Sequence, residues 1–156
     1  MSGASLRDRI AALNADYARA IDDDRLEEWP AFFEDPCLYK ITSADNHAQG
    51  MPAGLVYADS RGMLADRVAA LREANIYERQ RYRHIVGLPC VLDEEGGLAR
   101  VETPFLVVRV MRDGQMDVFA CGRYLDRIRA SGTMKFVERV VVCDSARVDT
   151  LIAIPL

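Results

Sequence analysis

The sequence predicts an α+β fold in which helices pack on one face of a long, strongly curved antiparallel sheet. In the first half of the chain, apolar residues recur at the spacing of an amphipathic helix. From residue 82 onward they alternate with a period of two, which is typical of half-buried strands. The chain has 156 residues, 50% of them hydrophobic, so we expect residues 1–156 to form a single domain.

The first helix is predicted to begin after Ser5, which with Asp8 forms a capping-box-like start. Five apolar residues at spacings of 4, 3, 4 and 4 form its buried face: Leu6, Ile10, Leu13, Tyr17 and Ile21. The acidic run at 22–24 ends the helix. The apolar piece that follows, residues 26–33, contains Pro30 and is therefore at most a broken helix.

One strand and a second long helix are expected next. Residues 37–42 have the pattern of a strand, and residues 43–58, which contain several glycines and prolines, have that of a loop. Asp59 or Ser60 then caps the second helix, which we expect to end near residues 76–77.

Four long strands follow, at residues 82–92, 98–111, 116–129 and 134–144. Glycine-containing turns separate them, so successive hairpins form a meander. Strands of this length stay in one sheet only if it twists and curls. The predicted product is a cone whose concave face holds the helices and encloses a hollow.

The last strand is apolar on both faces. Two sets of residues alternate along it: Phe136, Val140 and Val142, and Val137, Val141 and Cys143. A sheet face in water would instead alternate apolar with polar residues. We therefore expect another subunit to cover the outer face.

Composition disfavours several classes of protein. The net charge of −4 argues against nucleic-acid binding. The four cysteines lack zinc or iron–sulfur spacing, and each lies in an apolar stretch where a reduced cysteine packs as a small hydrophobe. The start of the chain lacks the apolar core of a signal peptide, and no apolar run suffices to span a membrane, so a cytoplasmic protein is expected.

The two histidines, His47 and His84, limit where imidazole chemistry can occur. Strand alternation places Tyr82 and His84 on one face, where Asp22 could join them as an acid–base group inside the hollow. The alternative is a histidine held by hydrogen bonds in the sheet or at an interface. His47 lies in a polar segment that either meets a ligand or is simply solvated, and no spacing supports a metal site that uses both histidines.

Arginines gather before and within the first long strand, at Arg72, Arg79, Arg81 and Arg83. Glutamates are interleaved with them, and mixed charge is poorly suited to a phosphate backbone. Guanidinium groups pair well with carboxylates, either inside the domain or across an interface.

The order and spacing of four segments resemble the small (beta) subunits of bacterial aromatic-ring-hydroxylating dioxygenases. These segments are residues 17–33, 81–85, 103–109 and 122–126. The resemblance extends from about residue 10 to residue 156. It implies the cystatin-like, nuclear-transport-factor-like cone that this family shares with scytalone dehydratase and ketosteroid isomerase.

The resemblance implies that the chemistry belongs to a partner chain. In this family the Rieske 2Fe-2S cluster and the mononuclear iron lie on the large (alpha) subunit, so no cofactor and no catalytic residue is expected here. The small subunit forms a trimer within an α3β3 hexamer. The complex adds both atoms of O2 to an aromatic acid to give a cis-dihydrodiol, with electrons supplied from NAD(P)H by a separate reductase.

Six residues are candidates for structural roles or subunit contacts: Arg79, Arg81, Arg83, His84, Phe136 and Val140. Two other functions remain open. A stand-alone dehydratase, isomerase or cyclase would use Asp22, Tyr82 and His84 in an open hollow. A binding module would bind a small molecule there without turnover.

Overall fold

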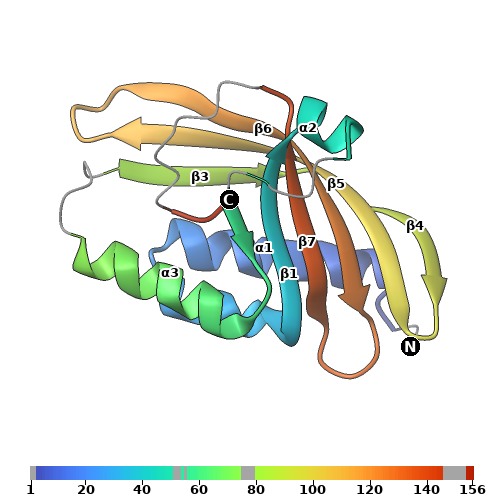
Figure 1. The fold of residues 1–156 in the computed structure, drawn as a ribbon. Helices are drawn as coiled ribbons and strands as arrows, with labels where there is room; N and C mark the ends of the chain where they lie inside the picture. The colour runs from blue at the N-terminus through green and yellow to red at the C-terminus, as the bar shows by residue number, and fades with distance from the viewer. Residues whose placement is uncertain (1–2, 51–53, 55, 75–79, 146–153) are drawn as a thin grey trace.

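The computed structural model describes residues 3–50, 54, 56–74, 80–145 and 154–156. Its helices are α1 (Leu6–Asp22), the 3-10 helix η1 (Leu26–Phe32), α2 (Ala44–Ala48) and α3 (Arg61–Glu73). Its strands are β1 (Phe33–Ser43), β2 (Val56–Ala58), β3 (Gln80–Val86), β4 (Cys90–Glu95), β5 (Leu98–Met111), β6 (Met116–Arg129) and β7 (Lys135–Cys143). Figure 1 shows α1 and α3 on one side of a strongly curved sheet, which confirms the predicted fold class.

Local sequence sets both ends of α1. Ser5 Oγ accepts a hydrogen bond from the Asp8 backbone N–H at 3.1 Å and so caps the N-terminus. The helix ends at Asp22, as predicted, and Asp24 adopts a φ of 61° as the chain turns toward η1. η1 contains Pro30, in agreement with the broken helix expected there.

The segment between β1 and α3 differs from the prediction. Residues 43–58, expected as a loop, contain α2 and β2; Ser43 caps α2, and β2 pairs with β1. Ser60 caps α3 by accepting the backbone N–H of Met63 at 3.1 Å. This helix ends at Glu73, before its predicted end, which lies outside the described residues.

The strands form one sheet in the order β2-β1-β7-β6-β5-β3, and β4 also pairs with β5. The predicted strand 82–92 is divided into β3 and β4 at Gly87, whose N–H donates to Pro104 O at 2.9 Å. A Cβ atom at position 87 would lie 2.7 Å from Pro104 Cγ, so this close approach needs glycine. One pair, β1 with β7, is parallel, which departs from the wholly antiparallel sheet expected; α3 and the strands β2 to β6 lie between these two strands in the chain.

A β-bulge in β7 changes which of its residues share a face, and the prediction on this point was wrong. Arg127 pairs with Glu138 and Ile128 with Phe136, so Val137 is an extra residue without a partner on β6. The bulge shifts the alternation by one residue. Phe136 therefore packs in the core and not on the outer face with Val140.

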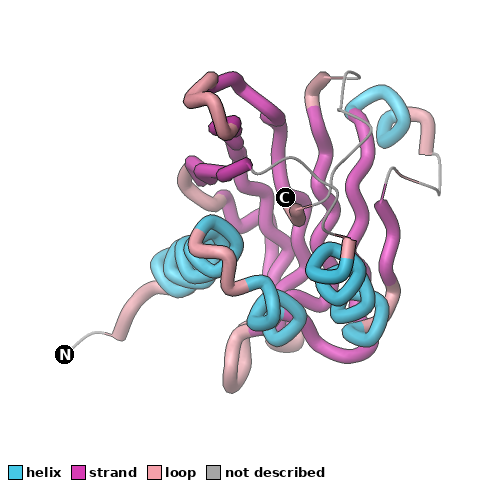
Figure 2. The backbone as a smooth tube through the Cα atoms, turned by 90° about the vertical axis from the view of Figure 1, so that its left-hand side faces the viewer, coloured by secondary structure: helices cyan, strands magenta, loops and turns pink. Residues whose placement is uncertain are grey.

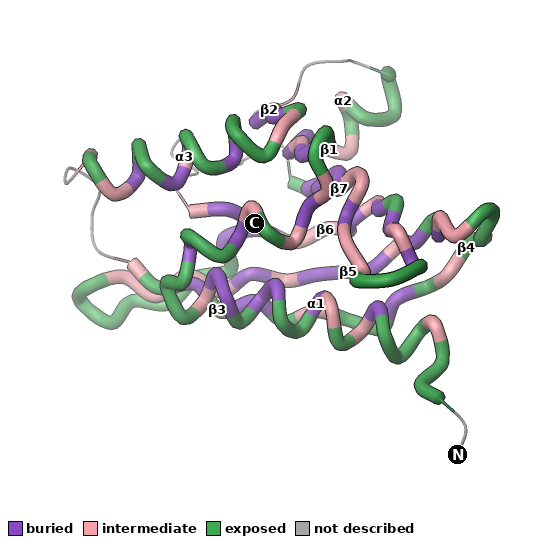
Figure 3. The backbone as a smooth tube through the Cα atoms, turned by 90° about the horizontal axis from the view of Figure 1, so that it is seen from below, coloured by how far each residue is buried: buried purple, intermediate pink, exposed green. Residues whose placement is uncertain are grey.

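The helices close the concave face of the sheet, as Figure 2 shows from a second side. Figure 3 shows buried and exposed positions alternating along α1, with the buried side toward the sheet. None of the described helices combines the length and apolarity needed to cross a membrane.

Candidate functional site

A buried ion pair lies inside the cone. Arg139 contacts both carboxylate oxygens of Asp126 at 2.9 Å, and its Nη2 also donates to Asn14 Oδ1 at 2.6 Å. Neither charged side chain has any exposed surface. Protein side chains thus occupy this part of the predicted hollow.

Aromatic rings surround the Arg139 guanidinium. Its central carbon lies 3.8 Å from the ring centre of Tyr124, 4.0 Å from that of Phe136 and 4.4 Å from that of Tyr17. Attraction to the ring faces offsets part of the cost of burying the cation. Burial alone lowers the pKa of Arg139, but the Asp126 carboxylate outweighs this effect and raises the pKa, so the guanidinium stays charged. Burial raises the pKa of Asp126, and the charge and hydrogen bonds of Arg139 oppose that shift.

Asp22 and His84 meet, as the sequence suggested. Asp22 Oδ1 lies 2.7 Å from His84 Nδ1, and Asp22 Oδ2 accepts the His84 backbone N–H at 2.8 Å. The His84 side chain is fully buried. A carboxylate can only accept hydrogen bonds, so Nδ1 is the donor, and Nε2 has no partner among the described residues.

A cleft of about 440 Å³ opens beside this pair, at the mouth of the cone. Its lining is formed by Ile21, Asp22, Asp23, Asp24, Leu71, Gln80, Arg81, Tyr82, Arg83 and Ile154. Asp22 and Tyr82 therefore face the cleft, whereas the imidazole of His84 is not part of its lining. The pair serves as a buried clamp that ties the end of α1 to β3.

Replacing Asp22 tests this clamp. Asp22→Ala leaves two buried donors of His84 without an acceptor, and each such group costs about 1–3 kcal/mol. We expect urea denaturation to show a loss of stability in that range or larger. Asp23→Ala is the matched control, since the Asp23 side chain is half exposed and forms a 3.7 Å ion pair with the similarly exposed Arg25. Equal losses in the two variants would contradict the clamp.

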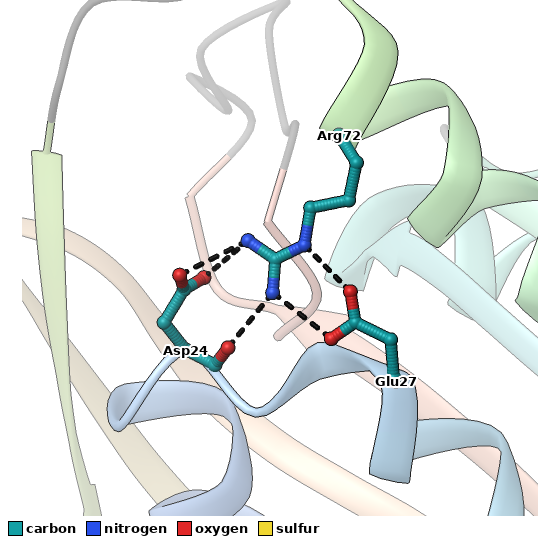
Figure 4. Close-up of polar contacts among 3 residues, drawn as sticks. All are labelled: Asp24, Glu27 and Arg72. Carbon is teal, nitrogen blue, oxygen red and sulfur yellow. Dashed lines mark hydrogen bonds and ion pairs between the residues drawn. The ribbon is translucent and has the colours of Figure 1, made fainter.

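Arg72 forms a second clamp at the mouth, shown in Figure 4. Its Nε donates to Glu27 at 2.7 Å, and its Nη1 donates to the Asp24 carboxylate at 2.9 Å. Nη2 donates to the Asp24 backbone oxygen at 2.8 Å and to Glu27 at 3.0 Å. The arginine thus joins α3 to Asp24 in the turn after α1 and to Glu27 in η1.

This second clamp gives the protein a specific acid sensitivity. The hydrogen bond from Arg72 lowers the pKa of Glu27 from 4.5 to about 2. Because the folded-state pKa is depressed, the contribution of Glu27 to stability is complete above about pH 4.5 and is lost as the pH falls toward 2. The stability of wild type and Glu27→Gln, measured from pH 6 to pH 2, should therefore converge at the acid end. Parallel curves over this range would refute the assignment.

The outer face of the sheet carries an apolar patch with two arginines beside it. Cross-strand pairing aligns three rows across β3, β5 and β6: Arg81–Val110–Met116, Arg83–Val108–Val118 and Ile85–Leu106–Cys121. We call these nine residues the outer patch. Ile85 is 54% exposed, Val118 61% and Met116 69%. A run of exposed apolar side chains across three strands is typical of a protein interface.

The other predicted site residues lie apart. Arg79 lies outside the described residues. His47 is in α2 and, with Val140, lines a smaller cleft of about 240 Å³ on the outer face. The described residues contain no group of three or more His, Cys, Asp or Glu side chains that could hold a metal ion. Cys90 is exposed at the start of β4, which corrects the expectation that every cysteine is packed inside.

Comparison with known proteins identifies the family. Residues 16–150 match the family described as the ring-hydroxylating beta subunit. The chain belongs to this family. It is 52% identical over 149 residues to the beta 1 subunit of the terminal oxygenase component of terephthalate 1,2-dioxygenase from a Comamonas species, with 95% of this chain and 97% of that protein covered.

Two further relatives extend the comparison. The anthranilate 1,2-dioxygenase small subunit of Burkholderia cepacia is 35% identical, with 94% of this chain and 92% of that protein covered. A crystal structure from Novosphingobium aromaticivorans, provisionally assigned as the beta subunit of an aromatic-ring-hydroxylating dioxygenase, superposes with a TM-score of 0.89. It is 38% identical and covers 96% of both chains. Both the resemblance inferred from the sequence and the cone fold are confirmed.

Sequence reasoning missed the interior ion pair. Its signal was Arg139, which strand alternation places on the same face as the apolar residues Val137, Val141 and Cys143. A buried arginine needs a carboxylate partner, and Asp126 on the preceding strand was available to supply one.

Proposed function

We propose that this chain is the structural small subunit of the terminal oxygenase of a terephthalate ring-hydroxylating dioxygenase. The observation that carries the proposal is its 52% identity, over nearly the whole chain, to the Comamonas terephthalate 1,2-dioxygenase beta subunit. The complex would act in the cytoplasm. It would add both atoms of O2 to the ring of the aromatic acid and form a cis-dihydrodiol, while NAD(P)H supplies two electrons through a separate reductase.

The large (alpha) subunit would supply the metal centres. Both the Rieske 2Fe-2S cluster and the mononuclear iron need several histidine, cysteine or carboxylate ligands close together. The part of the chain that the structure describes offers no such group, so the proposal assigns both centres to the partner. Three small and three large subunits would form an α3β3 hexamer in which the small subunits contact one another.

The outer patch supports a subunit role. Exposed Ile85, Met116 and Val118 give an apolar centre, and Arg81 and Arg83 at its edge can pair with carboxylates of a neighbouring chain. We assign Arg81 and Arg83 to subunit contacts. His84 and Phe136 are assigned to internal structure, because both are buried within the subunit.

A stand-alone dehydratase, isomerase or cyclase is the second candidate, because Asp22 and His84 form a carboxylate–imidazole pair next to a cleft. That function needs His84 Nε2 to reach a substrate. The His84 side chain has no exposed surface, so the geometry favours the structural role.

Purification from the native host tests both candidates. The tagged chain is purified under mild conditions from cells grown on terephthalate, and the eluate is assayed for iron and for its visible spectrum. We expect a larger chain in about equal amount and the red-brown colour of a Rieske cluster. A colourless eluate without a partner chain would overturn the proposal, and metal-free turnover by the chain alone would establish the second candidate.

A further inference from the structure

The segment Ile154–Leu156 lies inside the fold. Leu156 has no exposed surface and belongs to the apolar core, and Pro155 is also buried. The C label lies among the helices and the sheet in Figures 1 and 2, and between α1 and α3 in Figure 3. The segment thus occupies space that the cone encloses.

Side chains from two elements, α1 and β1, hold the backbone of Leu156. Tyr17 OH on α1 donates to Leu156 O at 2.9 Å, and Tyr39 OH on β1 donates to the same oxygen at 3.0 Å. The Leu156 N–H donates back to Tyr39 at 3.1 Å. Trp29 Nε1 on η1 in turn donates to Tyr17 OH at 3.0 Å. Two phenol donors therefore converge on one oxygen atom of Leu156.

The walls of this site pack against one another. The ring centres of Trp29 and Tyr39 are 5.0 Å apart, and Phe33 lies 5.9 Å from each of these two rings, all edge-on. These contacts do not involve the segment that occupies the site. Burial raises the pKa of both Tyr17 and Tyr39, so the two phenols stay protonated and remain donors.

The occupied site adjoins the cleft at the mouth of the cone. Ile154, the first residue of the segment, lines that cleft with Ile21 and Leu71. The cleft therefore reaches the first residue of the buried segment.

We propose that Ile154–Leu156 is a built-in ligand, and that the phenols of Tyr17 and Tyr39 with their aromatic walls form a binding site for a small apolar molecule that bears a carbonyl or carboxylate oxygen. That oxygen would replace Leu156 O between the phenols, and the apolar body would replace the leucine side chain. The site is distinct from the outer patch and does not depend on assembly with a large subunit.

A variant that lacks residues 154–156 tests the proposal, with circular dichroism as the measure of folding. Trp29 is the only tryptophan in the chain, and its indole N–H bonds to Tyr17, so its fluorescence reports on the site. The probes are the peptide acetyl-Ile-Pro-Leu and benzamide. We expect both to change the fluorescence of the variant saturably and that of the full chain not at all. The control peptide acetyl-Ile-Pro-Asp should give no response.

Tyr39→Phe in the same shortened chain removes one donor and should weaken binding of acetyl-Ile-Pro-Leu about three- to tenfold. A folded variant that binds neither probe overturns the proposal. A variant that is unfolded and that the peptide does not refold also overturns it, because a preformed site must persist without its occupant.

A second variant keeps the chain at full length. Leu156→Ala leaves the oxygen of residue 156 on the phenols and vacates only the space of the side chain. Toluene, an apolar probe without a carbonyl, should then raise the melting temperature of this variant and leave that of wild type unchanged. Leu64→Ala, which truncates another fully buried leucine of the core, tests whether any core cavity responds in the same way. Failure of toluene to stabilise a folded Leu156→Ala protein would count against the apolar part of the site.

Discussion

Arg139→Ala is expected to lower the free energy of unfolding by about 3–5 kcal/mol, the usual cost of removing one partner of a buried ion pair. The substitution leaves the fully buried Asp126 carboxylate without its cation. It also removes the guanidinium from the centre of three aromatic rings. Domains of this size are stable by about 5–15 kcal/mol in total, so much of the stability would be lost. Urea denaturation of the purified chain measures the effect.

Two controls separate the buried pair from arginine pairs in general. Arg123 bonds Glu102 at 2.9 Å on the same sheet, but both side chains are partly exposed, so Arg123→Ala should cost about 0–1 kcal/mol. The double variant Arg139→Met with Asp126→Leu removes both charges together and should be far more stable than Arg139→Ala. If Arg139→Ala were as mild as Arg123→Ala, the interior pair would not have the energetic role that we give it.

Ile85→Asp is expected to abolish stable assembly with the large subunit while leaving the small subunit folded. Ile85 is 54% exposed on the outer patch, so a charge there meets water in the free subunit. In an assembled complex the same carboxylate would be buried against apolar atoms without a partner. Loss of an interface hot spot costs about 2 kcal/mol or more, equivalent to a roughly 30-fold or larger weakening. Size-exclusion chromatography of the co-expressed subunits measures it.

Arg83→Ala in the next row tests the assignment of the arginines to subunit contacts. It should weaken assembly and lower the oxygenase activity of the complex. The control is Tyr57→Asp on β2, which is also exposed but lies at the opposite end of the sheet. Wild-type assembly in both Ile85→Asp and Arg83→Ala would show that the outer patch is not an interface.

The sequence by itself determined the elements whose signals are local. The caps at Ser5 and Ser60, the end of α1 at Asp22 and the Pro30-containing η1 depend on residues a few positions apart. The turns after β4, β5 and β6 follow from glycines that adopt positive φ. The sequence also identified the family, because the order and spacing of its motifs can be recognised without knowledge of the fold.

Only the tertiary structure decided which residues share a face and what fills the interior. One unpaired residue, Val137, separates Phe136 from the face it was expected to share with Val140 and places it in the core, and periodicity alone cannot reveal a bulge. Besides its ion pair with Asp126, Arg139 bonds Asn14, which lies 125 positions away in the chain. Leu156 is anchored by Tyr17 across 139 positions. Such contacts depend on how the sheet curls around the helices, and this geometry is a property of the whole packed chain and not of any short segment.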